Sequence, residues 1–171
     1  VRQRAKLKQS LSRLIVILFP ELEKLFSTLH SETVYAILLE APDVRQIASM
    51  RVSQLENILQ IASNGRHGKD KAIEIINAAK KSIGSSIKAK SLELKHTIQL
   101  INALTEDIDE IETEIKTIVD KLNPPILSIP GVSYRMGAMI LAEIGDISRF
   151  SSSDKLLAYT GMSPSTYQSG Q

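Results

Sequence analysis

The chain has 171 residues, enough for about one domain, and it contains no Cys, so a disulfide framework and a thiolate metal site are excluded. Aromatic residues make up only 4% of the sequence, and Gly and Pro number 8 and 6. We therefore expect long helices rich in Ile, Leu, Ala and Val rather than a strand-and-turn fold. The net charge is only +2, but it is unevenly distributed along the chain.

Three segments carry this charge asymmetry. Residues 1–13 hold five basic and no acidic side chains, residues 66–95 hold eight basic against three acidic, and residues 106–120 hold seven acidic against one basic. The pattern fits a contact with nucleic acid or a membrane, and it also fits a set of solvated helix faces.

The ends of the chain and its longest apolar run indicate whether it is part of a longer protein and whether it enters a membrane. The sequence starts at Val1 without an initiator Met and stops at Ser169-Gly170-Gln171, so we expect an internal piece of a longer protein. The longest apolar run, residues 14–19, is far shorter than the ~18–20 residues that cross a bilayer. Pro20-Glu21 stands where a signal peptide needs small residues, so a cytoplasmic protein without a membrane partner is expected.

The first half of the chain reads as a series of short helices. Apolar spacing predicts an amphipathic helix up to residue 18, ended by Pro20, then a second amphipathic stretch over residues 22–29. Further helices are expected at residues 32–40, from about residue 52 to residue 63, and at residues 70–83.

A basic turn bounded by glycines separates the last two of these helices. Its sequence is Gly-Arg-His-Gly-Lys at residues 65–69, which makes Arg66 and Lys69 candidate contacts for a DNA phosphate. A plain helix connection explains the same residues.

A heptad pattern follows. Two registers of residues repeat every seven positions: Leu94, Ile101, Ile108, Ile115 and Leu122, and Thr97, Leu104, Ile111 and Ile118. They predict a coiled-coil helix over residues 87–122, about 54 Å long. Burial of a single stripe leaves such a helix marginal alone, so it needs a partner. The partner is another helix of this chain or a second copy, and we expect a homo-oligomer formed through this helix.

Gly, Pro and Ser crowd the sequence after residue 124. Ser133 is expected to cap a helix that Gly145 ends, and Ser152 or Ser153 to cap a helix that Gly161 follows. Residues 129–133, Ile-Pro-Gly-Val-Ser, look like the turn of a helix-hairpin-helix element, although a Ser replaces the second glycine of the usual Gly-x-Gly. The candidate DNA-binding residues here are Gly131, Ser133, Tyr134 and Arg135; a merely structural turn is the alternative.

No conventional catalytic set is visible from spacing. His30, His67 and His96 lack the spacing of metal ligands, and the phosphate-loop and dinucleotide fingerprints are absent, so no metal ligand is nominated in this chain. The residues by themselves predict an α-helical protein with a possible nucleic-acid contact. With the resemblance described next, we expect an all-α protein in three parts: a helical region at 1–86, a coiled-coil helix at 87–123, and a small helix-hairpin-helix-like domain, cut short, at 124–171.

Several segments resemble one family. Ser-Ile-Pro-Gly-Val-Ser at 128–133, Leu-Ala-Glu-Ile-Gly-Asp-Ile-Ser-Arg-Phe at 141–150, Lys-Leu-Leu-Ala-Tyr-Thr-Gly-Met-Ser-Pro-Ser at 155–165 and Gln-Ser-Gly at 168–170 resemble the C-terminal domain of DEDD-type insertion-sequence transposases, the one-ten family, which includes pilin-gene invertases. The resemblance extends upstream to residues 18–22, 63–72 and 81–84.

The resemblance implies a parent protein with an N-terminal RNase-H-like domain whose Asp-Glu-Asp-Asp carboxylates bind Mg²⁺. It implies a serine that attacks a DNA phosphate, placed at Ser169, with Ser165 and Ser163 as alternatives. A noncoding guide RNA would pair with both DNA partners, in the cytoplasm of a prokaryote. All four carboxylates would lie upstream of Val1, so residues 1–171 alone are expected to be inactive. The alternatives are a non-catalytic helix-hairpin-helix DNA-binding module with a coiled-coil dimerisation helix, and a purely structural coiled coil.

Overall fold

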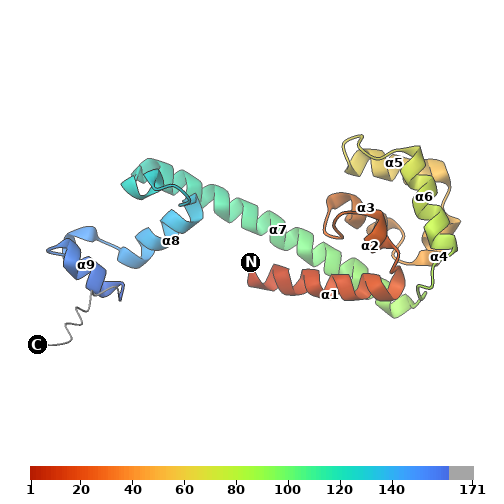
Figure 1. Cartoon of the computed structure of the whole chain (residues 1–171), viewed down its shortest axis with the longest axis horizontal. Helices are drawn as coiled ribbons and strands as arrows, with labels where there is room; N and C mark the ends of the chain where they lie inside the picture. The colour runs from red at the N-terminus through yellow and green to blue at the C-terminus, as the bar shows by residue number, and fades with distance from the viewer. Residues whose placement is uncertain (162–171) are drawn as a thin grey trace, which may run out of the picture. The chain divides into compact units, whose positions relative to one another are not determined.

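The computed structural model describes residues 1–161 of the chain, and over these residues it contains nine α-helices, two short 3-10 helices and no β-strand (Figure 1). The prediction of an all-α fold is therefore confirmed. The chain divides into two compact units, one of residues Val1–Glu110 and one that starts at Ile111. The long helix α7, Lys88–Leu122, contributes residues to both units. None of the described helices is long and apolar enough to cross a membrane.

The first unit is built from six helices and the start of α7. The six are α1 (Arg2–Leu18), α2 (Leu22–Leu25), α3 (Glu32–Glu40), α4 (Val44–Ser49), α5 (Val52–Ala62) and α6 (Lys69–Lys80). All seven elements contribute buried side chains to one hydrophobic core; those 0% exposed include Leu11, Leu22, Ile37, Ile47, Leu59, Ile75 and Leu94. Each such Leu or Ile contributes about 1.5–3 kcal/mol when it leaves water.

A buried carboxylate fixes the start of α4, a helix that the apolar spacing does not predict because it is only six residues long. Asp43 is 5% exposed, and its Oδ1 accepts hydrogen bonds from the amides of Arg45 and Gln46 at 3.0 and 3.1 Å. Its Oδ2 accepts from the hydroxyl of Ser86 at 3.1 Å and lies 3.4 Å from that of Ser91. One side chain therefore caps α4 and ties it to the beginning of α7.

Helix α1 runs antiparallel to the first part of α7 (Figure 1). At one end, the Arg4 guanidinium donates to Thr105 Oγ1 at 3.3 Å, and at the other end the Ser85 amide donates to the Ile17 carbonyl at 2.9 Å. Leu94 and Ile101 of the heptad pattern are buried in the core that α1 shares. The first part of the predicted coiled-coil helix therefore has its partner within the chain.

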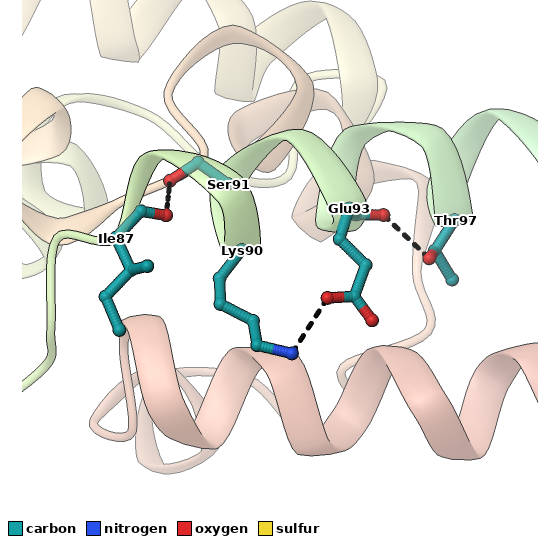
Figure 2. Close-up of polar contacts among 5 residues, drawn as sticks. All are labelled: Ile87, Lys90, Ser91, Glu93 and Thr97. Atoms are coloured by element: carbon teal, nitrogen blue, oxygen red, sulfur yellow. Dashed lines mark hydrogen bonds and ion pairs between the residues drawn. The ribbon is translucent and has the colours of Figure 1, made fainter.

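Two hydroxyl side chains lie on this buried face of α7, and both are satisfied within the helix (Figure 2). Ser91 Oγ donates to the Ile87 carbonyl at 3.2 Å, and Thr97 Oγ1 donates to the Glu93 carbonyl at 2.7 Å. On the same stretch the Lys90 ammonium lies 2.9 Å from the Glu93 carboxylate. Because each hydroxyl donates to a carbonyl of the preceding turn, Ser91 and Thr97 lie on the buried face without an unpaired hydrogen-bond donor.

Two predicted helices are shorter in the structure. The stretch at 22–29 is helical only over Leu22–Leu25, and α6 ends at Lys80 rather than at residue 83. After Lys80 the chain turns to follow the end of α1: Glu21 accepts hydrogen bonds from Ser82 Oγ and the Ile83 amide. Gly84 lies so close to the Leu18 carbonyl that a Cβ at this position would overlap it. Tertiary contacts thus override the helical spacing of residues 81–83.

The second unit contains the end of α7, the 3-10 helices η1 (Pro125–Ser128) and η2 (Ile147–Arg149), and the helices α8 (Tyr134–Ile144) and α9 (Ser153–Tyr159). The predicted caps are confirmed: Ser133 Oγ accepts from the Met136 amide at 3.2 Å, and Ser152 Oγ from the Lys155 amide at 3.4 Å. Gly145 ends α8 with a φ of +64°, a conformation that favours glycine.

In this unit, most apolar residues of the heptad pattern on α7 are exposed rather than buried. Val119 is buried, at 2% exposure, whereas Ile111, Ile118 and Leu122 are 58%, 55% and 64% exposed. The described residues therefore leave an apolar stripe of α7 open to solvent.

Candidate nucleic-acid interface

The basic turn of residues 63–69 begins where α5 ends. The Gly65 amide donates to the Gln60 carbonyl at 2.9 Å and the Asn64 amide to the Ile61 carbonyl at 3.4 Å, which is the bonding pattern of a Schellman C-cap. Asn64 and Gly65 have φ values of +52° and +80°. The turn therefore reverses the chain immediately before Arg66.

Hydrogen bonds then hold the predicted phosphate ligand Arg66 in place. Its Nε donates to the Ser63 carbonyl at 3.1 Å, and the His67 amide donates to Ser63 Oγ at 2.9 Å. Both Arg66 and Lys69, the first residue of α6, are exposed. The two predicted cations of this turn thus lie on one short surface segment.

A polar pocket of about 210 Å³ lies beside this turn. The connection from α2 to α3 supplies most of the other wall, and the lining residues are Phe26, Ser27, Thr28, Ser31, Thr33, Ser63, Arg66 and His67. The sequence analysis did not single out the hydroxyl residues at 27–33. Their only local signal is a cluster of Ser and Thr before a helix, which an ordinary cap explains equally well.

The second set of predicted DNA-binding residues lies in the second unit, at the start of α8. Gly131 has a φ of +90° and open space around it, and the Val132 amide closes the turn on the Ile129 carbonyl at 3.1 Å. Ser133 caps the helix, and Tyr134 and Arg135 are its first two residues. The turn predicted at 129–133 is therefore present, preceded by the single 3-10 turn η1.

Side chains of α7 interact with Tyr134 and Arg135, the two exposed residues of this turn that were predicted to bind DNA. The Arg135 guanidinium lies 3.4 Å from the Glu112 carboxylate. A hydrogen bond with Asp120 raises the pKa of the Tyr134 hydroxyl, and the Lys116 ammonium lies 5.5 Å from the centre of the Tyr134 ring. The acidic segment of α7 thus faces the residues that were predicted to meet phosphate.

An arginine that the sequence analysis missed as a site residue lies against two aromatic rings that also contact each other. The Arg149 guanidinium is 4.7 Å from the centre of the Phe150 ring and 4.8 Å from that of Tyr159, and the two ring centres are 5.3 Å apart. Stacking orients a guanidinium while its N–H groups still face outward. The only signal was the Arg-Phe pair at residues 149–150.

The nucleophile and the metal are the remaining parts of the predicted site. Ser163, Ser165 and Ser169 lie outside the described residues. Among residues 1–161, no three His, Asp or Glu side chains gather closely enough to hold a metal ion. Of the predicted site residues, the structure therefore describes those of the turn at 65–69 in the first unit and those of the turn at 129–135 in the second.

Comparison with known proteins connects the second unit to a family. Residues 123–171 match the profile of the transposase IS116/IS110/IS902 family. A similar protein is the insertion element IS110 uncharacterized 43.6 kDa protein of Streptomyces coelicolor, 32% identical over 72 residues. This match covers 41% of the present chain but only 18% of that relative. No solved structure matches significantly. The segment from residue 123 onward is therefore similar to transposases of the IS116/IS110/IS902 family.

Proposed function

We propose that the chain is part of a DNA transposase that moves an insertion sequence. The match of residues 123–171 to the transposase family carries the proposal. The turn at Gly131 adds support, because it delivers the first residues of a capped helix to the surface, where backbone amides and a cation suit a DNA phosphate.

The finer mechanism that we propose is serine-mediated strand cleavage. Ser169 Oγ attacks a DNA phosphorus, its proton passes to a general base, and a deoxyribose oxygen leaves, so that a phosphoserine ester joins protein and DNA. Ser165 and Ser163 are the alternatives. The supporting observation is the sequence Gly-Met-Ser-Pro followed by Gln-Ser-Gly at residues 161–170.

The partners that we propose are DNA, a guide RNA and further copies of the chain. The exposed apolar stripe of α7 at Ile111, Ile118 and Leu122 supports self-association. Mg²⁺ would be held by a nuclease domain outside this chain, and we assign no step to it here because the described residues offer no group of ligands.

The test uses the full-length protein and a DNA duplex that carries one end of the element. A covalent protein–DNA adduct is trapped in denaturant and located by mass spectrometry. We expect the adduct to disappear in Ser169→Ala and to persist in Ser151→Ala, a control at an exposed serine. An adduct that survives Ser169→Ala would refute this nucleophile. Salt-dependent DNA binding without any adduct would favour the non-catalytic DNA-binding module.

A further inference from the structure

The pocket beside the basic turn is lined mainly by groups that can donate a hydrogen bond. Thr28 Oγ1 accepts from the His30 amide at 3.1 Å, Ser31 Oγ from the Val34 amide at 3.3 Å, and Ser63 Oγ from the His67 amide at 2.9 Å. A hydroxyl carries one proton and accepts through its lone pairs. Each amide uses one lone pair of its hydroxyl oxygen, and the bonds described for these three hydroxyls are all accepted ones, so their protons can be donated to an acceptor that enters the pocket.

Arg66 adds charge to these donors. The bond from its Nε to the Ser63 carbonyl fixes the base of the guanidinium, and within the described residues no acceptor is recorded for the two Nη groups. A planar fork held in this way suits the oxygens of a phosphate. The pocket lining recorded for the described residues contains no Asp or Glu. Glu32 follows Ser31 in the sequence, and Glu74 pairs with Lys71 at 2.8 Å.

The apolar part of the lining is already engaged. The Phe26 ring meets the His67 ring edge-on, with centres 5.7 Å apart, and the Lys71 ammonium lies 5.2 Å from the centre of the Phe26 ring. These contacts hold His67 at the pocket and place a further cation nearby. Phe26 is thus not a free platform for stacking a base.

The size of the pocket limits its occupant. Pockets for drug-sized ligands hold roughly 300–1,000 Å³, whereas a water molecule takes about 30 Å³ of the liquid. A volume of about 210 Å³ is too small for most such ligands and ample for a tetrahedral oxyanion with its linking atoms.

We propose that the pocket between residues 26–33 and the turn at 63–67 binds one phosphodiester of a nucleic-acid backbone. The Arg66 fork and the hydroxyls of Thr28 and Ser31 contact its oxygens, and Lys69 contacts a neighbouring phosphate. The choice of nucleic acid as the occupant rests on the proposed function; the oxyanion specificity rests on the hydroxyl and guanidinium donors of the pocket. The phosphodiester is common to DNA and RNA, and separate probes distinguish the two.

The first experiment titrates the 171-residue chain with inorganic phosphate and follows backbone amide shifts by NMR, with potassium chloride at equal ionic strength as the reference. We expect saturable shifts around Thr28, Ser31 and Arg66 with phosphate alone. Arg66→Gln should abolish them, whereas Arg51→Gln, the same charge change at an exposed site on the N-cap of α5, should retain them. Shifts that spread over other basic surfaces, or that survive Arg66→Gln, would overturn the proposal.

A second variant guards against a structural effect of Arg66→Gln, since Arg66 also bonds to the turn. Ser27→Asp introduces a carboxylate at the exposed edge of the pocket, and no hydrogen bond of Ser27 is recorded within the described residues. It should abolish the phosphate shifts, while Ser53→Asp on the exposed surface of α5 should not. If the phosphate-induced shifts persist in both variants, or disappear in both, the proposal is overturned.

The second experiment measures affinity for a DNA duplex and for a single-stranded RNA across a range of salt. Loss of one phosphate contact should lower the slope of log K against log salt by about 0.9 for the duplex or about 0.7 for the single strand. We expect this for Arg66→Gln with at least one probe and not for Arg51→Gln. Equal slopes in the two variants would refute the pocket and leave the proposed function standing. A wild-type chain with no affinity for either probe at low salt would refute DNA as the partner as well.

Discussion

The guanidinium of Arg135, on the first turn of α8, pairs with the carboxylate of Glu112 on α7 at a distance of 3.4 Å between Nη1 and Oε1. Arg135 is the nearest cation to the turn at Gly131, where DNA phosphate is proposed to bind. Both side chains are 48% exposed, so the pair adds at most about 1 kcal/mol to stability. Its main consequence concerns binding, because a carboxylate occupies the guanidinium that a phosphate would need.

Removal of that carboxylate should strengthen DNA binding. In Glu112→Gln, Arg135 becomes free to meet a phosphate, so the slope of log K against log salt for duplex DNA should steepen by about 0.9. Fluorescence anisotropy at several salt concentrations measures this slope. Glu114→Gln, the same change at another exposed residue of α7, is the control. If the two variants bind DNA alike, the Glu112 pair does not compete with DNA.

The stability of the first unit should fall in mild acid because of His30. Ser12 Oγ donates to the Lys8 carbonyl at 3.2 Å, so the 3.1 Å bond between Ser12 Oγ and His30 Nε2 needs the proton of Nε2. His30 Nδ1 then accepts from the Tyr35 hydroxyl at 3.1 Å. Burial raises the pKa of Tyr35 to about 12, so this hydroxyl keeps the proton that it donates. This arrangement favours the neutral form of His30 in the folded chain.

Burial, aided by the charge of Lys8, lowers the pKa of His30 below its usual value. The unfolded chain therefore binds a proton more readily than the folded one, and the stabilising contribution is complete above about pH 6.5 and is lost as the pH falls from that value through the lower pKa of the folded chain. Urea unfolding followed by circular dichroism from pH 7.5 to 5 should show this loss. His30→Gln should reduce the pH dependence, and His96→Gln, at an exposed position, should not. An unchanged slope in His30→Gln would contradict the assignment.

Gly84 should tolerate no side chain. A Cβ there would overlap the Leu18 carbonyl, which is backbone and cannot rotate away. Gly84→Ala is expected to lower the free energy of unfolding by about 1–3 kcal/mol. Ser85→Ala is the neighbouring control; it keeps the amide bond to the Ile17 carbonyl and should change stability by less than about 0.5 kcal/mol. Equal urea midpoints for the two variants would show that the connection to α7 moves away from α1 at little cost.

The exposed stripe of α7 should mediate self-association. Burial of one Ile side chain contributes about 1.5–3 kcal/mol, so Ile118→Asn should weaken an oligomer at least about tenfold. Light scattering coupled to size-exclusion chromatography measures the mass as a function of concentration. Lys121→Asn, at an exposed polar position of the same helix, should leave the mass unchanged. A wild-type chain that stays monomeric at high concentration would rule out the homo-oligomer.

Signals between neighbouring residues predicted most of the local structure of this protein; the exceptions are α4, which is too short to show apolar spacing, and the ends of α2 and α6. Apolar spacing and the break at Asn123-Pro124-Pro125 located α7 to within one residue, and Ser133 and Ser152 located the starts of α8 and α9. These signals act between residues a few positions apart, where helix geometry alone decides which groups meet.

The partner of each helix face depends on how the whole chain packs. The heptad pattern continues unchanged from residue 94 to residue 122, yet α1 covers its beginning and its last residues stay exposed. Ser31 and Arg66 line one pocket, and Arg135 pairs with Glu112, across sequence separations that no local pattern encodes. The period of the apolar residues predicts which face of a helix is buried and which is solvated. It does not predict which other segment covers the buried face, because many apolar stripes and charged groups in a chain are chemically equivalent. The packing of the whole chain selects among them.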